Sequence, residues 1–118
     1  MAAPNLQTPT TITGKLAVQA VGTSATAIVS NATASGYLKR VMSLIIGNVT
    51  TSAATVTIDV FRSSTAYRIA TDLVVPAKGT VVPVTRDAFV SLEEGDDLRL
   101  TGSATSTLEA VASYEQVA

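Results

Sequence analysis

The sequence predicts an all-β domain in which two sheets pack face to face as a sandwich. Three observations predict it. Thr (18 residues), Val (15) and Ser (11) are abundant among the 118 residues, and β-branched side chains favour strands over helices. Apolar and polar residues alternate in short runs, and turn-forming residues separate these runs at regular spacing. The spacing predicts about eight short antiparallel strands, as in a jelly-roll-like or immunoglobulin-like sandwich.

The strands of the first half lie between clusters of small and polar residues. Such turn formers occupy residues 22–24, 31–36 and 50–52. The fourth strand shows the clearest alternation, because three apolar residues point to one face and three polar residues to the other. These are Val56, Ile58 and Val60 against Thr55, Thr57 and Asp59. The predicted strands of this half are 14–21, 25–30, 37–48 and 54–62.

Two features mark the second half. Pro83 has no N–H to donate to a strand ladder, which predicts that its strand lies at a sheet edge or contains a bulge. Turn formers at residues 94–96 interrupt one predicted strand, 88–93 with 97–101. The last strand directs Leu108, Ala110, Ala112 and Tyr114 to one face. The remaining predicted strands are 66–75, 80–86 and 107–116.

The chain length fits one domain, which we expect to span residues 13–118. Residues 1–12 show no clean alternation. Two interpretations stay open for them: an extended arm that reaches a neighbouring subunit, or a terminus without a role. The expected contact residues of such an arm are Pro4, Asn5, Leu6, Pro9 and Ile12.

The absence of cysteine and histidine excludes much of enzyme chemistry. Disulfides, thiolate nucleophiles and cysteine zinc sites all need cysteine. Histidine is the usual group for proton transfer near neutral pH. A serine nucleophile would need a lysine as its base, and Lys15, Lys39 and Lys78 lie in no recognisable Ser/Lys motif. We therefore expect no catalytic residues, no cofactor and no enzyme.

Charge and hydropathy narrow the class of partner. The formal net charge is −1 and 14% of the residues are charged, whereas nucleic-acid binders carry a basic patch or stripe. The longest apolar runs, such as 44–46 and 73–75, are too short for a membrane helix. The first residues do not resemble a secretory signal. We expect a soluble protein, made in a cytoplasm, that binds neither nucleic acid nor membrane.

One acidic cluster is the strongest candidate for a site. Glu93, Glu94, Asp96 and Asp97 surround Gly95. Such carboxylates could bind a hard cation such as Ca²⁺, although the spacing is not that of an EF-hand loop. They could also form a turn in which Gly95 adopts a positive φ, and this is the interpretation we favour, so no metal site is expected. Paired carboxylates of a glycosidase would usually lie beside aromatic platforms, and the chain has only three Tyr, two Phe and no Trp.

Several short segments resemble small virion structural proteins of tailed phages, notably marine and cyanobacterial ones. A hydrophobic strand, a Val-Pro-Ala turn and a Leu-Glu-x-Gly-Asp-x-Leu segment recur in β-sandwich proteins of phage particles. The resemblance extends along nearly the whole chain, because the segments are spread from residue 11 to residue 115, although each motif alone is short. The matching segments are Thr11–Lys15, Leu44–Val49, Ala54–Val60, Ala66–Ala70, Val74–Ala77, Leu92–Arg99 and Ser113–Glu115.

The resemblance implies a virion protein, made in the host cytoplasm. The first expectation is a capsid decoration (cement) protein that binds the major capsid protein and stabilises the head lattice. A second is a tail, neck or fibre-attachment protein that binds other virion proteins. A third, of another class, is a host-surface or carbohydrate-binding module. Particle proteins commonly form closed symmetric oligomers, and we expect a homo-oligomer, with a trimer as the predicted form.

Overall fold

A computed structural model describes residue 4 and residues 6–118. All regular structure in this part of the chain is β, arranged as nine strands in two packed sheets. The predicted all-β, two-sheet sandwich is therefore confirmed. The strands are β1 (Ile12–Val21), β2 (Thr26–Ser30), β3 (Leu38–Asn48), β4 (Ala54–Arg62), β5 (Thr65–Val75), β6 (Thr80–Val84), β7 (Val90–Leu92), β8 (Asp97–Gly102) and β9 (Leu108–Val117).

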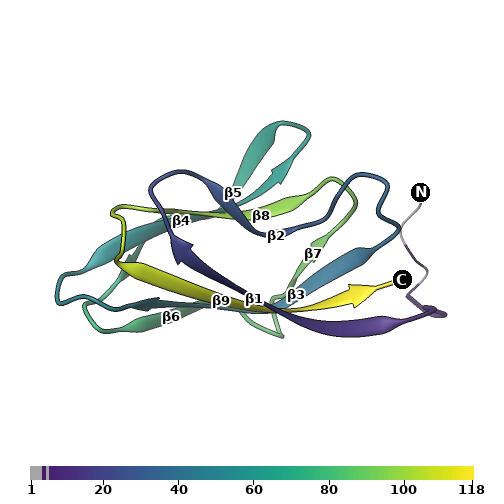
Figure 1. Cartoon of the computed structure of the whole chain (residues 1–118), viewed down its shortest axis with the longest axis horizontal. Coiled ribbons are helices and arrows are strands. Elements are labelled where there is room, and N and C mark those ends of the chain that lie inside the picture. Colours follow the sequence, from purple (N-terminus) through teal and green to yellow (C-terminus); the bar gives the residue numbers. More distant parts are fainter. Residues whose placement is uncertain (1–3, 5) are drawn as a thin grey trace.

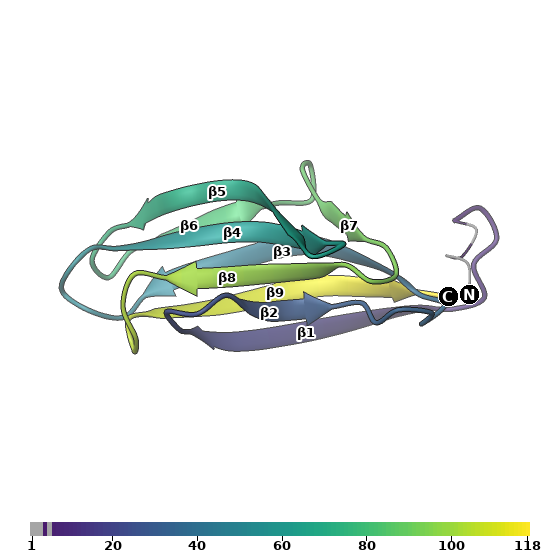
Figure 2. The same cartoon turned by 90° about the horizontal axis from the view of Figure 1, so that it is seen from above.

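The strands pair as in a long hairpin that has been rolled up. Sheet A has the order β1-β9-β3-β6, with β7 also paired to β3, and sheet B has the order β2-β8-β4-β5. All of these pairs are antiparallel. The pairs nest from β4–β5 at the centre of the chain, through β3 with β6 and β7, to β2–β8 and β1–β9. This nesting is the jelly-roll arrangement, and Figures 1 and 2 show the two layers.

The core lies between the sheets and consists of aliphatic side chains from both. Alternation along each strand supplies it, as in β8, where Leu98 and Leu100 are fully buried and Arg99 between them points outward. Each such side chain contributes roughly 1.5–3 kcal/mol when it is removed from water. The largest fully buried residues are Leu44, Ile46, Ile58, Leu92, Leu98, Leu100 and Leu108.

The prediction of one interrupted strand at 88–93 and 97–101 is wrong. The two halves are separate strands that belong to different sheets: β7 pairs with β3 in sheet A, and β8 pairs with β2 and β4 in sheet B. The reason is the turn between them, which carries the chain from one layer to the other. Hydrophobic alternation continues on both sides of this turn, so the pattern alone does not reveal the change of sheet.

The prediction for Pro83 is confirmed. Its strand, β6, lies at the edge of sheet A. The register with β3 runs from Leu44 opposite Val84 to Ile46 opposite Val81. Two residues of β6, Val82 and Pro83, therefore lie opposite the single residue Ile45, which is a β-bulge. Pro83 is tolerated because neither a sheet edge nor a β-bulge requires its nitrogen to donate a ladder hydrogen bond.

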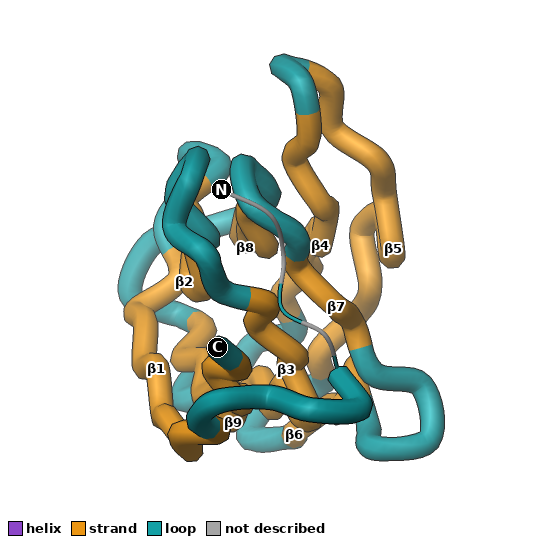
Figure 3. The backbone as a smooth tube through the Cα atoms, turned by 90° about the vertical axis from the view of Figure 1, so that its right-hand side faces the viewer, coloured by secondary structure: helices purple, strands orange, loops and turns teal. Residues whose placement is uncertain are grey.

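The tip of the β4–β5 hairpin projects outward beyond the layer of sheet B, away from sheet A, as Figures 1 and 3 show. Its two-residue turn consists of Ser63 and Ser64, with φ angles of 51° and 61°. Two successive positive φ angles are characteristic of the type I′ turn, whose twist matches that of the flanking strands. The projecting hairpin brings Arg62 over the turn between β7 and β8.

Candidate functional site

A row of apolar side chains crosses the outer face of sheet A. Val18 of β1 lies opposite Val111 of β9, and Val111 lies opposite Ile45 of β3. Val82 of β6 points outward in the bulge opposite Ile45. We call these four residues the apolar row. Single exposed apolar side chains are normal on a protein surface, but this row runs across four neighbouring strands.

The most exposed part of this face lies on β1. Leu16 and Val18 are 65% and 70% exposed, the highest values among the large hydrophobic side chains of the described residues. Two shallow hollows flank them along β1 and β9. One, of about 330 Å³, lies beside Val18 and Val111, and the other, of about 460 Å³, lies beside Leu16 and Met42. This surface is thus both apolar and slightly concave, which suits contact with a protein partner.

The outer face of sheet B differs because charged and hydroxyl side chains dominate it. Asp59 of β4 pairs with Arg99 of β8 at 3.0 Å, and the Arg99 guanidinium stacks 3.9 Å above the ring of Phe61. As predicted, Asp59 points away from the core, but only 2% of its surface is exposed. The outward direction therefore does not expose this carboxylate to solvent, because neighbouring side chains cover it.

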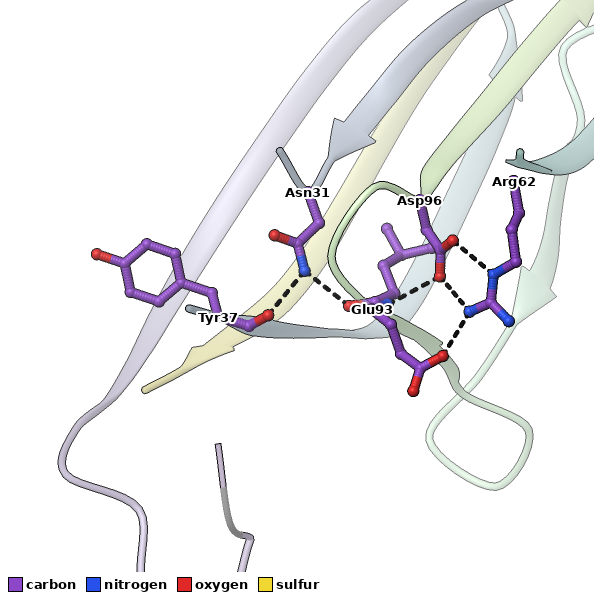
Figure 4. A network of polar contacts seen from close by, with 6 residues as sticks. Asn31, Tyr37, Arg62, Glu93 and Asp96 are labelled. Atoms are coloured by element: carbon purple, nitrogen blue, oxygen red, sulfur yellow. Dashed lines mark hydrogen bonds and ion pairs between the residues drawn. The ribbon is translucent and has the colours of Figure 1, made fainter. Parts of the chain in front are cut away.

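The acidic cluster forms the turn from β7 to β8. Gly95 has a φ of 90°, as the turn interpretation predicts. The Gly95 N–H donates to the Asn31 carbonyl at 2.7 Å, and the Asn31 N–H donates to the Asp96 carbonyl at 2.9 Å. The Asn31 side-chain amide donates to the carbonyls of Tyr37 and Leu92, both at 2.9 Å (Figure 4). These hydrogen bonds thus join the turn to the β2–β3 loop.

Arg62 neutralises the buried carboxylate of this turn (Figure 4). Its Nε and Nη2 donate to the two carboxylate oxygens of Asp96 at 2.7 and 2.5 Å, and Nη2 also donates to Glu93 at 2.7 Å. The hydrogen bonds from Arg62 lower the pKa of the Asp96 carboxyl, against the opposing effect of burial, and the Glu93 backbone N–H lowers it further. The hydrogen bond to Asp96 likewise raises the pKa of Arg62.

The four carboxylates of the cluster have partners within the chain. Glu94 accepts a hydrogen bond from the Gly36 N–H, and Asp97 accepts one from the Ser30 hydroxyl, in addition to the pairs with Arg62. Within the described residues, no group of three or more Asp, Glu, His or Cys side chains is placed to hold a metal ion. The turn interpretation is confirmed, and the geometry adds nothing to the cation interpretation.

The described part of the predicted arm lies at the end of the sandwich where the C-terminus also lies (Figure 2). Ile12 is the first residue of β1, so it belongs to sheet A. Leu6 is exposed at a turn, whereas Pro4 and Pro9 are half-buried, and Asn5 lies outside the described residues. Thr10 and Thr11 donate their N–H groups to the Ala118 carbonyl at 2.6 and 3.3 Å. A partner contact by this segment stays a prediction.

Sequence reasoning missed both the apolar row and the partner of the acidic turn. The row depends on the register of strands that are distant in the chain. Nothing in the sequence identifies Arg62 as the partner of the acidic turn, except that it directly precedes the Ser63-Ser64 turn. For the row, the available signal was that Val18, Ile45 and Val111 lie at positions that alternate with core residues.

The comparisons with known families and curated proteins show no similarity to this chain. No protein-family model matches it, and no curated protein has a significantly similar sequence. Within residues 4 and 6–118, no helix is long and apolar enough to span a membrane.

Proposed function

We propose that this protein is a structural component of a phage particle, and most specifically a capsid decoration protein that binds the major capsid protein through the outer face of sheet A. The observation that carries the proposal is the apolar row. A contiguous exposed apolar strip on a small domain is typical of a surface that a protein partner covers. The phage context comes from the resemblance of the sequence segments, because a fold by itself hosts many functions.

The physical role of such a protein is to stabilise an assembled lattice. A protein that binds the assembled state and not the free subunits shifts the equilibrium towards assembly by mass action. The chain needs no catalytic group for this, in keeping with the absence of His and Cys. The polar outer face of sheet B would then face the solvent.

Two alternatives keep specific support. The same apolar row would serve equally in a tail, neck or fibre-attachment protein, where the neighbour is another virion protein. Jelly rolls also occur in lectin domains, which supports the carbohydrate-binding alternative. Against the latter, the three tyrosines lie on separate elements: Tyr37 in the β2–β3 loop, Tyr67 on β5 and Tyr114 on β9. A glycan array with specific hits would favour it over a structural role.

The number of copies in a purified particle tests the proposal. The chain is quantified by mass spectrometry against the major capsid protein in particles of the phage that encodes it. A ratio near one copy per capsid subunit, or one oligomer per local symmetry axis, is expected for decoration. A few copies to a few dozen would move the protein to the tail, neck or fibre base. Its absence from the particle would overturn both structural roles.

A pair of lysine variants tests the surface. Ile45→Lys places a charge at the centre of the apolar row, where contact with the capsid would bury it, and we expect capsid occupancy to fall by ~10-fold or more. Val74→Lys is the matched control, since Val74 is an exposed aliphatic residue on the outer face of sheet B. Equal occupancy for the two variants would exclude the apolar row as the contact.

A further inference from the structure

The free edges of the two sheets are not protected equally. Exposed strand edges invite pairing with other chains, and proteins usually blunt them by shortness, bulges, prolines or charges. In sheet A, β6 has Pro83 and a bulge, and β7 has three residues. In sheet B, β2 has five residues and an irregular register, and the pairing of β5 with β4 is shifted twice. Each of these edges thus carries at least one protective feature.

The remaining edge strand, β1, has almost none of these protective features. Its ten residues pair with β9 without interruption, from Ile12 opposite Val117 to Val21 opposite Leu108. The strand contains no proline, and Lys15 is its single charged residue. Figure 2 shows β1 as the outermost strand of sheet A along its whole length. A long, regular and nearly uncharged edge of this kind is a template for another strand.

The hydrogen bonds identify which groups of β1 face outward. Thr11 and Ala118 exchange both of their backbone hydrogen bonds, at 3.3 and 2.9 Å. Such pairs alternate along an antiparallel ladder, so every second residue from Thr11 bonds to β9 and the residues between direct their N–H and C=O groups away. None of these outward groups has a backbone hydrogen bond to another described residue. They belong to Ile12, Gly14, Leu16, Val18 and Ala20.

We propose that β1 pairs antiparallel with β1 of a second copy of this chain, about a twofold axis at Ala17. In this register Leu16 of each copy lies opposite Val18 of the other, and Gly14 lies opposite Ala20. Both members of these pairs have outward backbone groups, so each pair can exchange two hydrogen bonds. The two A sheets then form one continuous sheet across the axis.

Side-chain chemistry selects this register and this occupant. Leu16 and Val18, the two most exposed large hydrophobic side chains, contact each other across the axis, and the apolar rows of the two copies come together. Lys15 lies opposite Gln19, whereas a register centred on Lys15 would place like charges directly opposite each other, which is destabilising. An exchanged N-terminal segment fits less well, because Pro4 and Pro9 cannot donate to a ladder.

The pairing does not depend on the proposed role in a particle, and its test needs the purified full-length chain alone. We expect sedimentation equilibrium to give twice the chain mass of 12.1 kDa. Val18→Lys should raise the dimer dissociation constant by ~10-fold or more, because it places two charges near the axis. Val74→Lys, on β5, should leave the dimer intact. Thermal unfolding checks that both variants fold.

Cysteine cross-linking tests the register, since the chain has no cysteine of its own. Opposed residues of a pair without hydrogen bonds have Cα atoms ~4.5 Å apart, which a disulfide can span. Ala17→Cys lies on the axis and should cross-link under mild oxidation. Gly14→Cys, where an added Cβ meets open space, lies opposite Ala20 and should not.

A monomer, a trimer, or a dimer that resists Val18→Lys and does not cross-link at residue 17 would overturn the pairing. A twofold strand pair does not by itself build the trimer expected from the sequence. None of these outcomes bears on the copy number in particles, so the two proposals fail independently.

Discussion

Asp96 keeps a negative charge although only 1% of the residue is exposed. Such a charge is tolerated in a protein interior only when it is paired and hydrogen-bonded. Arg62 supplies two of its hydrogen bonds and the Glu93 backbone N–H supplies another. One side chain therefore joins the β4–β5 hairpin to the turn between the two sheets.

Replacing this carboxylate should destabilise the protein in a pH-dependent way. We expect Asp96→Asn to lower the free energy of unfolding by ~1.5–3 kcal/mol at pH 7, the usual contribution of hydrogen bonds to a charged group. Arg62 lowers the pKa of the folded-state carboxyl. The contribution is thus complete above the unfolded-state pKa of ~3.9 and is lost as the pH falls through the lower folded-state pKa.

Urea unfolding of both proteins from neutral to acidic pH measures this difference. It should be constant above about pH 5 and shrink as the pH falls below ~4. Asp87→Asn, in the exposed β6–β7 loop, serves as the control and should match the wild type. Equal stability of Asp96→Asn and wild type at pH 7 would contradict the assigned role of the pair.

Arg99 has a comparable role on the outside of sheet B. Arg99→Ala should cost ~3–5 kcal/mol, because it leaves the Asp59 carboxylate buried without its partner. Arg99→Lys should cost less, since it keeps the charge and loses the planar stack on Phe61. Denaturant unfolding measures both. Arg68→Ala removes an exposed arginine opposite Asp59 and should stay within ~0.5 kcal/mol of wild type.

At the scale of elements, the turn of the β4–β5 hairpin has two successive non-glycine residues with positive φ. Ser64 has a φ of 61°, and a left-handed conformation costs an L-residue roughly 1–2 kcal/mol that glycine avoids. Glycine loses more backbone entropy than serine on folding, and this loss offsets part of the gain. We therefore expect Ser64→Gly to raise the free energy of unfolding by ~0.5–1 kcal/mol. Thermal unfolding detects this as a higher midpoint.

A matched control separates the turn effect from glycine in general. Ser24→Gly changes an exposed loop residue that has no positive φ, and it should be neutral or slightly destabilising. If both variants changed the midpoint in the same way, the stabilisation would not come from the type I′ geometry.

Most strands could be predicted because alternation and turn formers are local properties of the chain. The bounds 54–62 agree with β4, and the bounds of β3 differ from the prediction by one residue. The assignment of a strand to a sheet is not local. The 88–93 and 97–101 segments each show a correct pattern, yet hydrogen bonds from Asn31 hold the intervening turn so that they enter different layers.

The same distinction explains what could be predicted of the candidate site. The acidic turn is contiguous in sequence, and Gly95 identified its geometry. The apolar row joins β1, β9, β3 and β6, and it exists only through their register. No periodicity within one strand reveals which outward residues will become neighbours.

The whole molecule has two unlike outer faces. The outer face of sheet A carries the apolar row and the unprotected edge, and that of sheet B carries the Asp59–Arg99 pair. A domain built in this way can attach by one face and present the other to water. Pairing through β1 would place two apolar rows side by side, which doubles the attachment surface without further residues.

The N-terminal segment is the second predicted contact of the whole molecule with a neighbour. A chain that begins at Thr10 keeps the hydrogen bonds to Ala118, so we expect its free energy of unfolding to change by less than ~1 kcal/mol. If residues 1–9 lie on an adjacent subunit, the shortened chain should occupy capsids several-fold less in a cosedimentation assay. Full occupancy would leave the apolar row as the sole predicted contact.

Attachment through the outer face of sheet A should depend little on salt. The chain has a net charge of −1, and binding through the apolar row would gain its free energy from surface removed from water. Raising the ionic strength from about 0.1 M to 1 M shortens the Debye length from ~10 Å to ~3 Å. That change weakens charge-based attachment but not apolar attachment, and sulfate should strengthen the latter.

Cosedimentation with capsids that lack the protein measures occupancy at each ionic strength, with the integrity of those capsids as control. A loss of affinity of ~10-fold or more would indicate that ion pairs carry the contact, and the charged face of sheet B would then be the better candidate surface.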